Sequence, residues 1–307
     1  MHEPAYLALH QQGELARRAA AAQARLAACD LCPRRCGVER TTGEFGFCAT
    51  GRHALLSSAE AHFGEEAPLT GRRGSGTIFV SGCNLGCDFC QNAEISHARI
   101  GREVTADEWA EAMLALQRQG CHNVNIVTPT HVVPALLEAL EIAAAHDLHL
   151  PLVYNSGGYD APDALALLEG VVDIYMPDFK FWDPDVAGRY AQAPDYPEWA
   201  RRAIREMHRQ VGDLQLDPAG IAERGLLVRH LVLPDGLAGT KSVCRFLAAE
   251  ISPETYVNIM EQYHPAGRIS GDDPLARRTS QEEHEEALRE ARSAGLRRLD
   301  ERSARVL

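Results

Sequence analysis

From Thr77 onward, short apolar runs rich in β-branched residues alternate with stretches of helical character, and this alternation limits the fold more than any other feature. Near-continuous apolar runs are typical of strands buried on both faces, and intervening helices are typical of parallel pairing. The expected strands span residues 77–81, 123–127, 150–155, 172–176, 226–233 and 256–262. The expected helices between them span residues 105–119, 134–146, 162–169, 197–210 and 240–250. The sequence therefore predicts an α/β fold with a parallel sheet covered by helices.

The helix over 105–119 has the clearest local signals. Thr105 followed by Glu108 predicts a capping box at its start. Apolar side chains then recur at helical spacing, which predicts a buried stripe that belongs to the core rather than to a cofactor site. These side chains are Trp109, Met113 and Leu116.

The two ends of the chain differ from this middle part. An alanine-rich stretch over 10–28 predicts a helix, and the stretch over 280–294, acidic first and basic later, predicts another. Residues 29–76 are rich in Cys, Gly and Arg, so we expect a loop with little regular structure, as in a small metal-stapled unit.

The number of expected strands restricts the architecture further. Six strands are too few for the closed eight-stranded barrel, so a partial, open barrel or a doubly wound sheet remains. In both architectures, reactive side chains gather at the C-terminal ends of the strands.

Composition excludes several classes of function. The chain has 307 residues, a net charge of −12 and no long basic tract, which argues against non-specific nucleic-acid binding. No stretch approaches the ~20 apolar residues of a membrane span, and the N-terminus does not resemble a signal peptide. We therefore expect a cytoplasmic protein that binds neither nucleic acid nor membrane. Seven of the nine cysteines lie within residues 29–90, and in a reducing compartment this crowding indicates metal binding rather than disulfides.

Three of these cysteines, Cys83, Cys87 and Cys90, directly follow the first expected strand. Three thiolates are one fewer than a closed site requires, so a metal cluster held by them keeps one coordination position open. Gly82 and Gly86 allow the backbone to turn tightly around a bulky ligand. The alternative is a zinc loop that takes its fourth ligand from elsewhere, although this spacing is unusual for zinc ribbons.

The motif, with an aromatic residue before its third cysteine, resembles the cluster loop of the radical S-adenosylmethionine (SAM) enzymes. In that family three cysteines hold a [4Fe-4S] cluster, SAM chelates the fourth iron, and reductive cleavage of SAM gives a 5′-deoxyadenosyl radical that abstracts hydrogen. The chain most resembles the pyruvate formate-lyase activating enzyme group, and within it the proteins that carry an N-terminal cysteine cluster.

This resemblance implies a partial (βα)6-type parallel barrel over 77–264. It is preceded by an N-terminal helix and Cys-rich metal-binding segment over 1–76 and followed by a helical tail over 265–307. It also implies an electron donor of the flavodoxin or ferredoxin type, and a glycyl radical enzyme as protein substrate.

The resemblance extends to polar residues that follow later strands. The segments Asn155-Ser156-Gly157-Gly158 and Met176-Pro177-Asp178-Phe179-Lys180 resemble elements around the SAM carboxylate, and Thr128-Pro129-Thr130-His131 replaces the usual Gly-Gly-Glu at the SAM ammonium. Hydroxyl and backbone oxygens can accept from an ammonium, and a lysine can donate to a carboxylate. The cofactor-binding residues implied are Phe89, Gln91, Thr128, Thr130, Asn155, Ser156, Asp178, Lys180, Arg229 and His264.

A second group, Cys29, Cys32, Cys36 and Cys48, has enough thiolates to close a site. An auxiliary [4Fe-4S] cluster and a structural zinc ion both fit it, and either would staple the loop-rich segment onto the rest of the fold. The two remaining cysteines, Cys121 and Cys244, are expected to be small buried hydrophobic residues.

Three functions follow. The first is a radical SAM enzyme that activates a glycyl radical enzyme. The second is radical SAM modification of another peptide, protein or metabolite, which an auxiliary cluster would favour. The third is a zinc-binding interaction protein without catalytic activity, which fits the three-cysteine group poorly.

Overall fold

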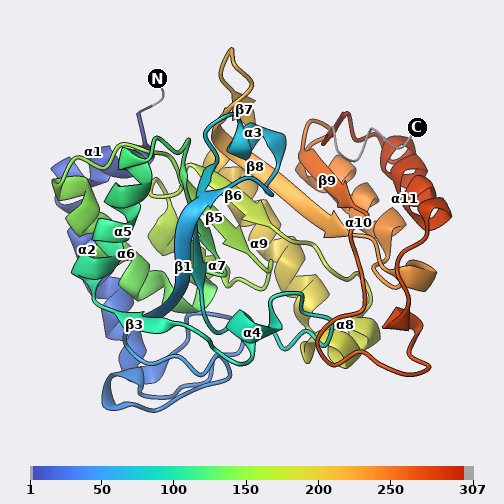
Figure 1. Ribbon diagram of the computed structural model, residues 1–307, viewed down its shortest axis with the longest axis horizontal. Coiled ribbons are helices and arrows are strands. Elements are labelled where there is room, and N and C mark those ends of the chain that lie inside the picture. Colours follow the sequence, from blue (N-terminus) through green and yellow to red (C-terminus); the bar gives the residue numbers. More distant parts are fainter. Residues whose placement is uncertain (1–2, 301–307) are drawn as a thin grey trace.

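The computed structural model describes residues 3–300, in which helices surround a mostly parallel sheet (Figure 1). Within these residues the strand order is β10-β9-β8-β6-β5-β4-β2-β1-β3, and β7 pairs with β8. The strands are β1 (Ala54–His62), β2 (Ser75–Val80), β3 (Arg102–Val104), β4 (Val124–Val127), β5 (Leu152–Ser156), β6 (Ile174–Pro177), β7 (Gln215–Leu216), β8 (Ala222–Leu231), β9 (Tyr256–Met260) and β10 (Arg298–Leu299). The neighbours from β2 to β9 pair in parallel and in chain order. The predicted α/β fold with a parallel sheet is confirmed.

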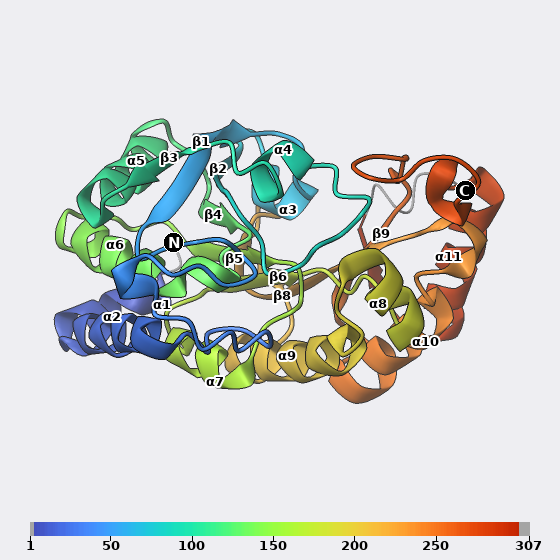
Figure 2. The same ribbon diagram turned by 90° about the horizontal axis from the view of Figure 1, so that it is seen from below.

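The helices follow one another around the outside of this sheet, as Figure 2 shows for α5, α6, α7, α9, α10 and α11. The helices are α1 (Ala5–Gln11), α2 (Glu14–Ala24), α3 (Ala67–Thr70), α4 (Ala93–Ser96), α5 (Ala106–Arg118), α6 (Val133–Ala145), α7 (Pro162–Leu165), α8 (Pro184–Ala191), α9 (Tyr196–Val211), α10 (Thr240–Phe246) and α11 (Gln281–Ser293). A π-helical turn, Leu247–Ile251, continues α10. Helix α2 packs against α6, so the N-terminal helices form a further layer on the helical side.

The local signals read from the sequence are confirmed. At the start of α5, the Thr105 hydroxyl accepts from the Glu108 amide at 3.2 Å, and the Glu108 carboxylate accepts from the Thr105 amide at 2.8 Å. The predicted apolar stripe of this helix is buried. Both remaining cysteines are buried as well, Cys121 at 3% and Cys244 at 0% exposure. The core thus lies between the sheet and its covering helices.

The prediction of a loop throughout residues 29–76 is wrong. Strand β1 (Ala54–His62) pairs antiparallel with β2 and with β3, which extends the parallel sheet at one edge. Its sequence, Ala-Leu-Leu-Ser-Ser-Ala-Glu-Ala-His, holds residues that are mostly poor strand formers, and most of it is only half-buried. Pairing with β2 therefore imposes a conformation that local sequence does not favour.

Helix α8 was not predicted, although its start carries a clear signal. The Asp183 carboxylate accepts from the amides of Asp185 and Val186, and Pro184 occupies the first turn. An Asp N-cap followed by proline is a strong helix-start pattern. No helix within residues 3–300 is long and apolar enough to cross a membrane.

Candidate functional site

A cavity of about 380 Å³ lies at the C-terminal ends of β2, β4, β5, β6 and β8. Its volume falls in the usual range of small-molecule sites, and its place is where parallel α/β sheets carry reactive groups. The predicted site residues that border it are Cys83, Cys87, Phe89, Cys90, Gln91, Thr128, Asn155, Ser156, Asp178, Lys180 and Arg229. Most of the residues proposed from separate strand ends are therefore brought to one place.

The cysteine loop is held by neighbouring segments. Its first residue, Gly82, has a φ of +86°, a left-handed conformation that favours glycine. The amide of Asp88 donates to the carbonyl of Tyr190 at 2.8 Å, which ties the loop to the end of α8. On the other side, the Arg268 guanidinium donates to the Asp88 carboxylate and to the Gly86 carbonyl. The loop is thus fixed by contacts from two later parts of the chain.

Burial controls the protonation of the thiols in this loop. Burial and, after it, the charge of the neighbouring Cys87 raise the pKa of Cys83 to about 12. Burial also raises the pKa of Cys87 to about 11, although the positive charge of Lys180 opposes this rise. Both thiols are therefore protonated until a metal displaces their protons, and metal binding at this loop must release them.

Charged groups that are half-buried or buried form a network in the same cavity wall. Lys180 forms an ion pair with Asp178, and the Arg229 Nε donates to the same carboxylate at 3.2 Å. Arg229 also donates to the Asn155 side-chain oxygen at 2.7 Å and to the Glu65 carboxylate at 3.0 Å. Much of the hydrogen-bonding capacity of the Arg229 guanidinium is used inside the protein, so this side chain orients its neighbours.

The charged side chains of this network stabilise one another in their ionised forms. Burial alone would raise the pKa of Asp178, but the charges of Lys180 and Arg229 outweigh it and hold this pKa below its ordinary value. Burial would likewise lower the pKa of Lys180, but Asp178 and Cys87 outweigh it and raise this pKa. The Lys180 ammonium therefore stays charged beside the cysteine loop, where it can bind an anionic group.

Two acidic residues of this site were missed by sequence reasoning. Glu65 borders the cavity and pairs with Arg229, and Glu66 accepts from the Asn258 side chain at 2.8 Å. Burial raises the pKa of Glu66 against the opposing charge of Arg229. A Glu-Glu pair outside any expected strand carries no local signal, since such pairs are usually solvated.

Two predicted residues lie outside the cavity lining. The hydroxyl of Thr130 donates to the buried carboxylate of Asp160 at 2.7 Å, and Thr130 does not border the cavity. His264 lies at the rim, where its Nδ1 is 3.3 Å from the side-chain nitrogen of Gln91. Ser156 borders the cavity but also donates to Asp160, at 2.7 Å. Asp160, another residue that the sequence did not single out, thus anchors the ends of β4 and β5.

The cavity wall also contains a strained residue. Thr128 has a φ of +63°, which is a true outlier for a β-branched side chain. Its amide donates to the Asn155 carbonyl at 2.8 Å, so the neighbouring strand end fixes this conformation. Strain of this kind costs on the order of 1–3 kcal/mol and is concentrated at functional sites.

Phe89 is mostly a packing residue. It is 5% exposed, and its ring makes edge contacts with Phe181 and Tyr263 at centroid distances of 5.8 and 5.9 Å.

The second cysteine group, Cys29, Cys32, Cys36 and Cys48, borders a separate and smaller cavity.

Part of the chain matches a known protein family, and most of it aligns with a known protein. Residues 77–213 match the family profile described as the Radical SAM superfamily. This part of the chain is a radical SAM superfamily domain. The chain is 32% identical over 278 residues to an uncharacterized protein of Methanocaldococcus jannaschii, covering 87% of this chain and 75% of that protein.

Among solved structures, the chain is similar to a radical SAM methyltransferase from Sphaerobacter thermophilus. The TM-score is 0.49 and the sequence identity 16%, with 73% of this chain and 65% of that one covered. The chain therefore spans about two thirds of the length of that protein.

A radical SAM superfamily domain implies a [4Fe-4S] cluster and SAM as cofactors. The residues of the cavity fit both. Three thiols share one loop without a fourth cysteine in the cavity wall, and a fixed ammonium faces them. The donor set thus offers ligands for three irons and polar groups for a zwitterionic cofactor.

Proposed function

We propose that Cys83, Cys87 and Cys90 hold the [4Fe-4S] cluster of this radical SAM enzyme and that SAM occupies the adjoining cavity. When bound, the cluster supplies one electron that cleaves the sulfonium of SAM to methionine and a 5′-deoxyadenosyl radical, which abstracts hydrogen from a substrate. The observation that carries the proposal is the convergence of these thiols with Asp178, Lys180 and Asn155 on one cavity.

The chain's own residues would position SAM. We infer that the Lys180 ammonium donates to the SAM carboxylate, since Asp178 holds it charged beside Cys87. We infer that oxygens of Thr128 accept from the SAM ammonium in place of an acidic residue. Arg229 acts as a positioning residue, because its guanidinium joins Asp178, Asn155 and Glu65.

We also propose that the sheet from β2 to β9 is the partial (βα)6 barrel that the resemblance implies, since six parallel strands follow in chain order with helices outside. An electron donor of the flavodoxin or ferredoxin type would reduce the cluster.

Which hydrogen atom the radical abstracts is predicted only from the resemblance. Activation of a glycyl radical enzyme would remove it from a backbone glycine of a partner, and the alternative is another peptide, protein or metabolite. The comparisons support neither in particular. Deuterium carried into 5′-deoxyadenosine from a glycine-labelled glycyl radical enzyme would support the first, whereas absence of label would refute it for that partner.

The test of SAM cleavage uses anaerobically reconstituted, dithionite-reduced protein. Wild type is expected to form 5′-deoxyadenosine and methionine, and Cys87→Ala is expected to form neither, because one iron loses its thiolate. Cys244→Ala serves as the matched control, since this buried cysteine lies in α10. Cleavage by Cys87→Ala at the wild-type rate would refute the cluster assignment.

A further inference from the structure

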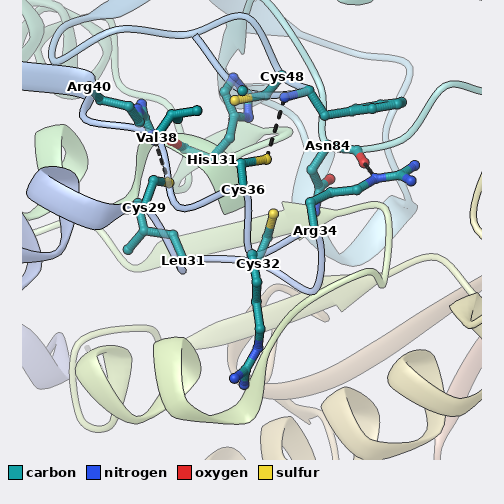
Figure 3. Close-up of a pocket in the computed structure, with 13 residues that line it drawn as sticks. Cys29, Leu31, Cys32, Arg34, Cys36, Val38, Arg40, Cys48, Asn84 and His131 are labelled. Carbon is teal, nitrogen blue, oxygen red and sulfur yellow. Dashed lines mark hydrogen bonds between the residues drawn. The ribbon is translucent and has the colours of Figure 1, made fainter. Parts of the chain in front are cut away.

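The four upstream cysteines border one cavity, and their labelled side chains lie around it in Figure 3. Cys29 and Cys32 are buried, Cys48 is half-buried and Cys36 is exposed. The thiols thus surround a small space of their own, distinct from the cavity beside Lys180.

Main-chain hydrogen bonds hold the thiols around this space. The Cys29 amide donates to the Val38 carbonyl at 3.0 Å, and the Gly37 amide donates to the Cys29 carbonyl at 2.9 Å. The amide of Phe47 is directed at the sulfur of Cys36 at 3.5 Å. Amide contacts to sulfur favour the thiolate form and are among the features that tune iron–sulfur clusters.

A buried positive charge lies against the same thiols. Arg40 is 2% exposed, and its Nη1 is 3.7 Å from the sulfur of Cys29. Its other hydrogen bonds go to the carbonyl oxygens of Gly51 and His131. A buried guanidinium requires a compensating charge, and four metal-bound thiolates would supply one.

The arrangement of the thiols favours a cluster over a single ion. A zinc ion binds four sulfurs at a Zn–S distance of roughly 2.3 Å, so the four sulfurs must lie close together. Within residues 3–300, no three Cys, His, Asp or Glu side chains converge closely enough to hold a single metal ion. The same holds for Cys83, Cys87 and Cys90, the cysteines proposed above to hold the family's cluster. In a [4Fe-4S] cluster each cysteine binds a different iron, so the sulfurs stand further apart.

We propose that Cys29, Cys32, Cys36 and Cys48 hold a second [4Fe-4S] cluster. Four thiolates close this site, so it has no open iron for SAM. The proposal goes beyond SAM cleavage at the first site and does not depend on it.

The second site supports the first through direct contacts between the two cysteine loops. A Cβ added at Gly82 would lie 2.8 Å from the Cys48 carbonyl, and one added at Gly86 would lie 3.1 Å from the Phe47 ring. Between these contacts, the Arg34 Nε donates to the carbonyl of Asn84 at 3.0 Å. Ordering of the second loop by a cluster would therefore help to fix the loop that carries Cys83 and Cys87.

The first test counts metals in wild-type protein that has been reconstituted anaerobically with iron and sulfide in the presence of zinc. About eight irons and no zinc per chain are expected for two clusters. About four irons, with or without one zinc, would overturn the proposal and would leave the proposed SAM cleavage intact.

The second test separates the two sites by mutation. The triple variant Cys83→Ala, Cys87→Ala and Cys90→Ala is expected to retain about four irons. Its reduced cluster should give an electron paramagnetic resonance signal that SAM leaves unchanged. Loss of all iron from this variant, in a chain that wild-type-like circular dichroism shows to be folded, would refute the second site. If SAM changed no signal in wild type either, the proposed function would fail instead.

The complementary variant Cys32→Ala and Cys36→Ala should lose about four irons, keep a signal that SAM changes, and bind SAM several-fold more weakly. Cys121→Ala with Cys244→Ala is the matched control, since both cysteines are buried in the core and border neither cavity. Retention of all iron by Cys32→Ala and Cys36→Ala would overturn the proposal. If either variant fails to fold, the wild-type metal count decides.

Discussion

The Tyr196 hydroxyl connects two strand ends that border the cavity proposed to bind SAM, and its removal tests how this site is held together. Tyr196 is fully buried in the first turn of α9. Its oxygen accepts from the Lys180 amide at 2.8 Å and lies 3.0 Å from the carbonyls of Gly157 and Asp178. The hydroxyl thereby joins the segment after β5 to the segment after β6.

The expected cost of Tyr196→Phe follows from these contacts. The ring keeps its packing against Tyr159 and Phe181, with centroid distances of 6.1 and 5.9 Å, so the change removes only the hydroxyl. It leaves the Lys180 amide without its acceptor and removes a donor from the two carbonyls. An unsatisfied buried polar group costs ~1–3 kcal/mol, so we expect a loss of about 2 kcal/mol in the free energy of unfolding.

Chemical denaturation under anaerobic conditions, followed by circular dichroism, measures this loss. Equilibrium binding of SAM is the second readout, because Gly157 and Lys180 border the cavity. We expect SAM to bind roughly fivefold more weakly, which corresponds to about 1 kcal/mol. Tyr175→Phe is the matched control, since this buried hydroxyl donates to Gln210 at 2.7 Å and lies outside the cavity wall.

The reasoning would be refuted by a Tyr196→Phe protein as stable as wild type. It would also be refuted if Tyr175→Phe weakened SAM binding as much as Tyr196→Phe did, because the effect would then reflect stability in general.

Two further predictions concern the same strand ends. Gly158→Ala should lower the unfolding free energy by about 2 kcal/mol or more, because φ is +76° and the added Cβ would lie 2.1 Å from the Asp178 carbonyl. The control Gly212→Ala, with φ +72° and no atom within 4 Å, should lose only about 1 kcal/mol in the same denaturation assay, and equal losses would contradict this account. Asp178→Asn should cost about 2 kcal/mol at neutral pH, since it leaves Lys180 without its carboxylate partner and removes one of the carboxylates that Arg229 contacts. The lowered pKa of Asp178 means that this stabilisation is present above the ordinary value of 3.8 and is lost as pH falls through the lowered pKa. The wild-type and Asp178→Asn stabilities measured against pH should therefore converge in acid, and a constant difference would contradict the assignment.

Local sequence determined much of the fold. The six expected strands correspond to β2, β4, β5, β6, β8 and β9, because buried parallel strands need continuous apolar runs that are visible without a partner. Strand β1 could not be found in this way, because its partner β2 supplies the hydrogen bonds that its own residues do not favour. Helix α8, although not predicted, carries a local signal in its Asp183 cap, so its start is encoded in the sequence.

The residues of the candidate site also fall into two groups, those with a local sequence signal and those placed only by tertiary packing. Spacing within one loop singled out Cys83, Cys87 and Cys90, because ligands that are close in sequence stay close in space whatever the rest of the chain does. The ends of parallel strands meet at one edge of a sheet, which is why Asp178 and Lys180 could also be expected there.

Only the tertiary structure decided which distant groups complete the site. Glu65 reaches Arg229 across 164 residues of sequence, and Tyr196 fixes the backbone at Lys180 from a helix outside the sheet. It also placed the loop of Cys29–Cys48 against the loop of Cys83–Cys90, through the close approach of Gly82 to the Cys48 carbonyl. Such contacts depend on the packing of segments far apart in the chain, and no local pattern of residues encodes them.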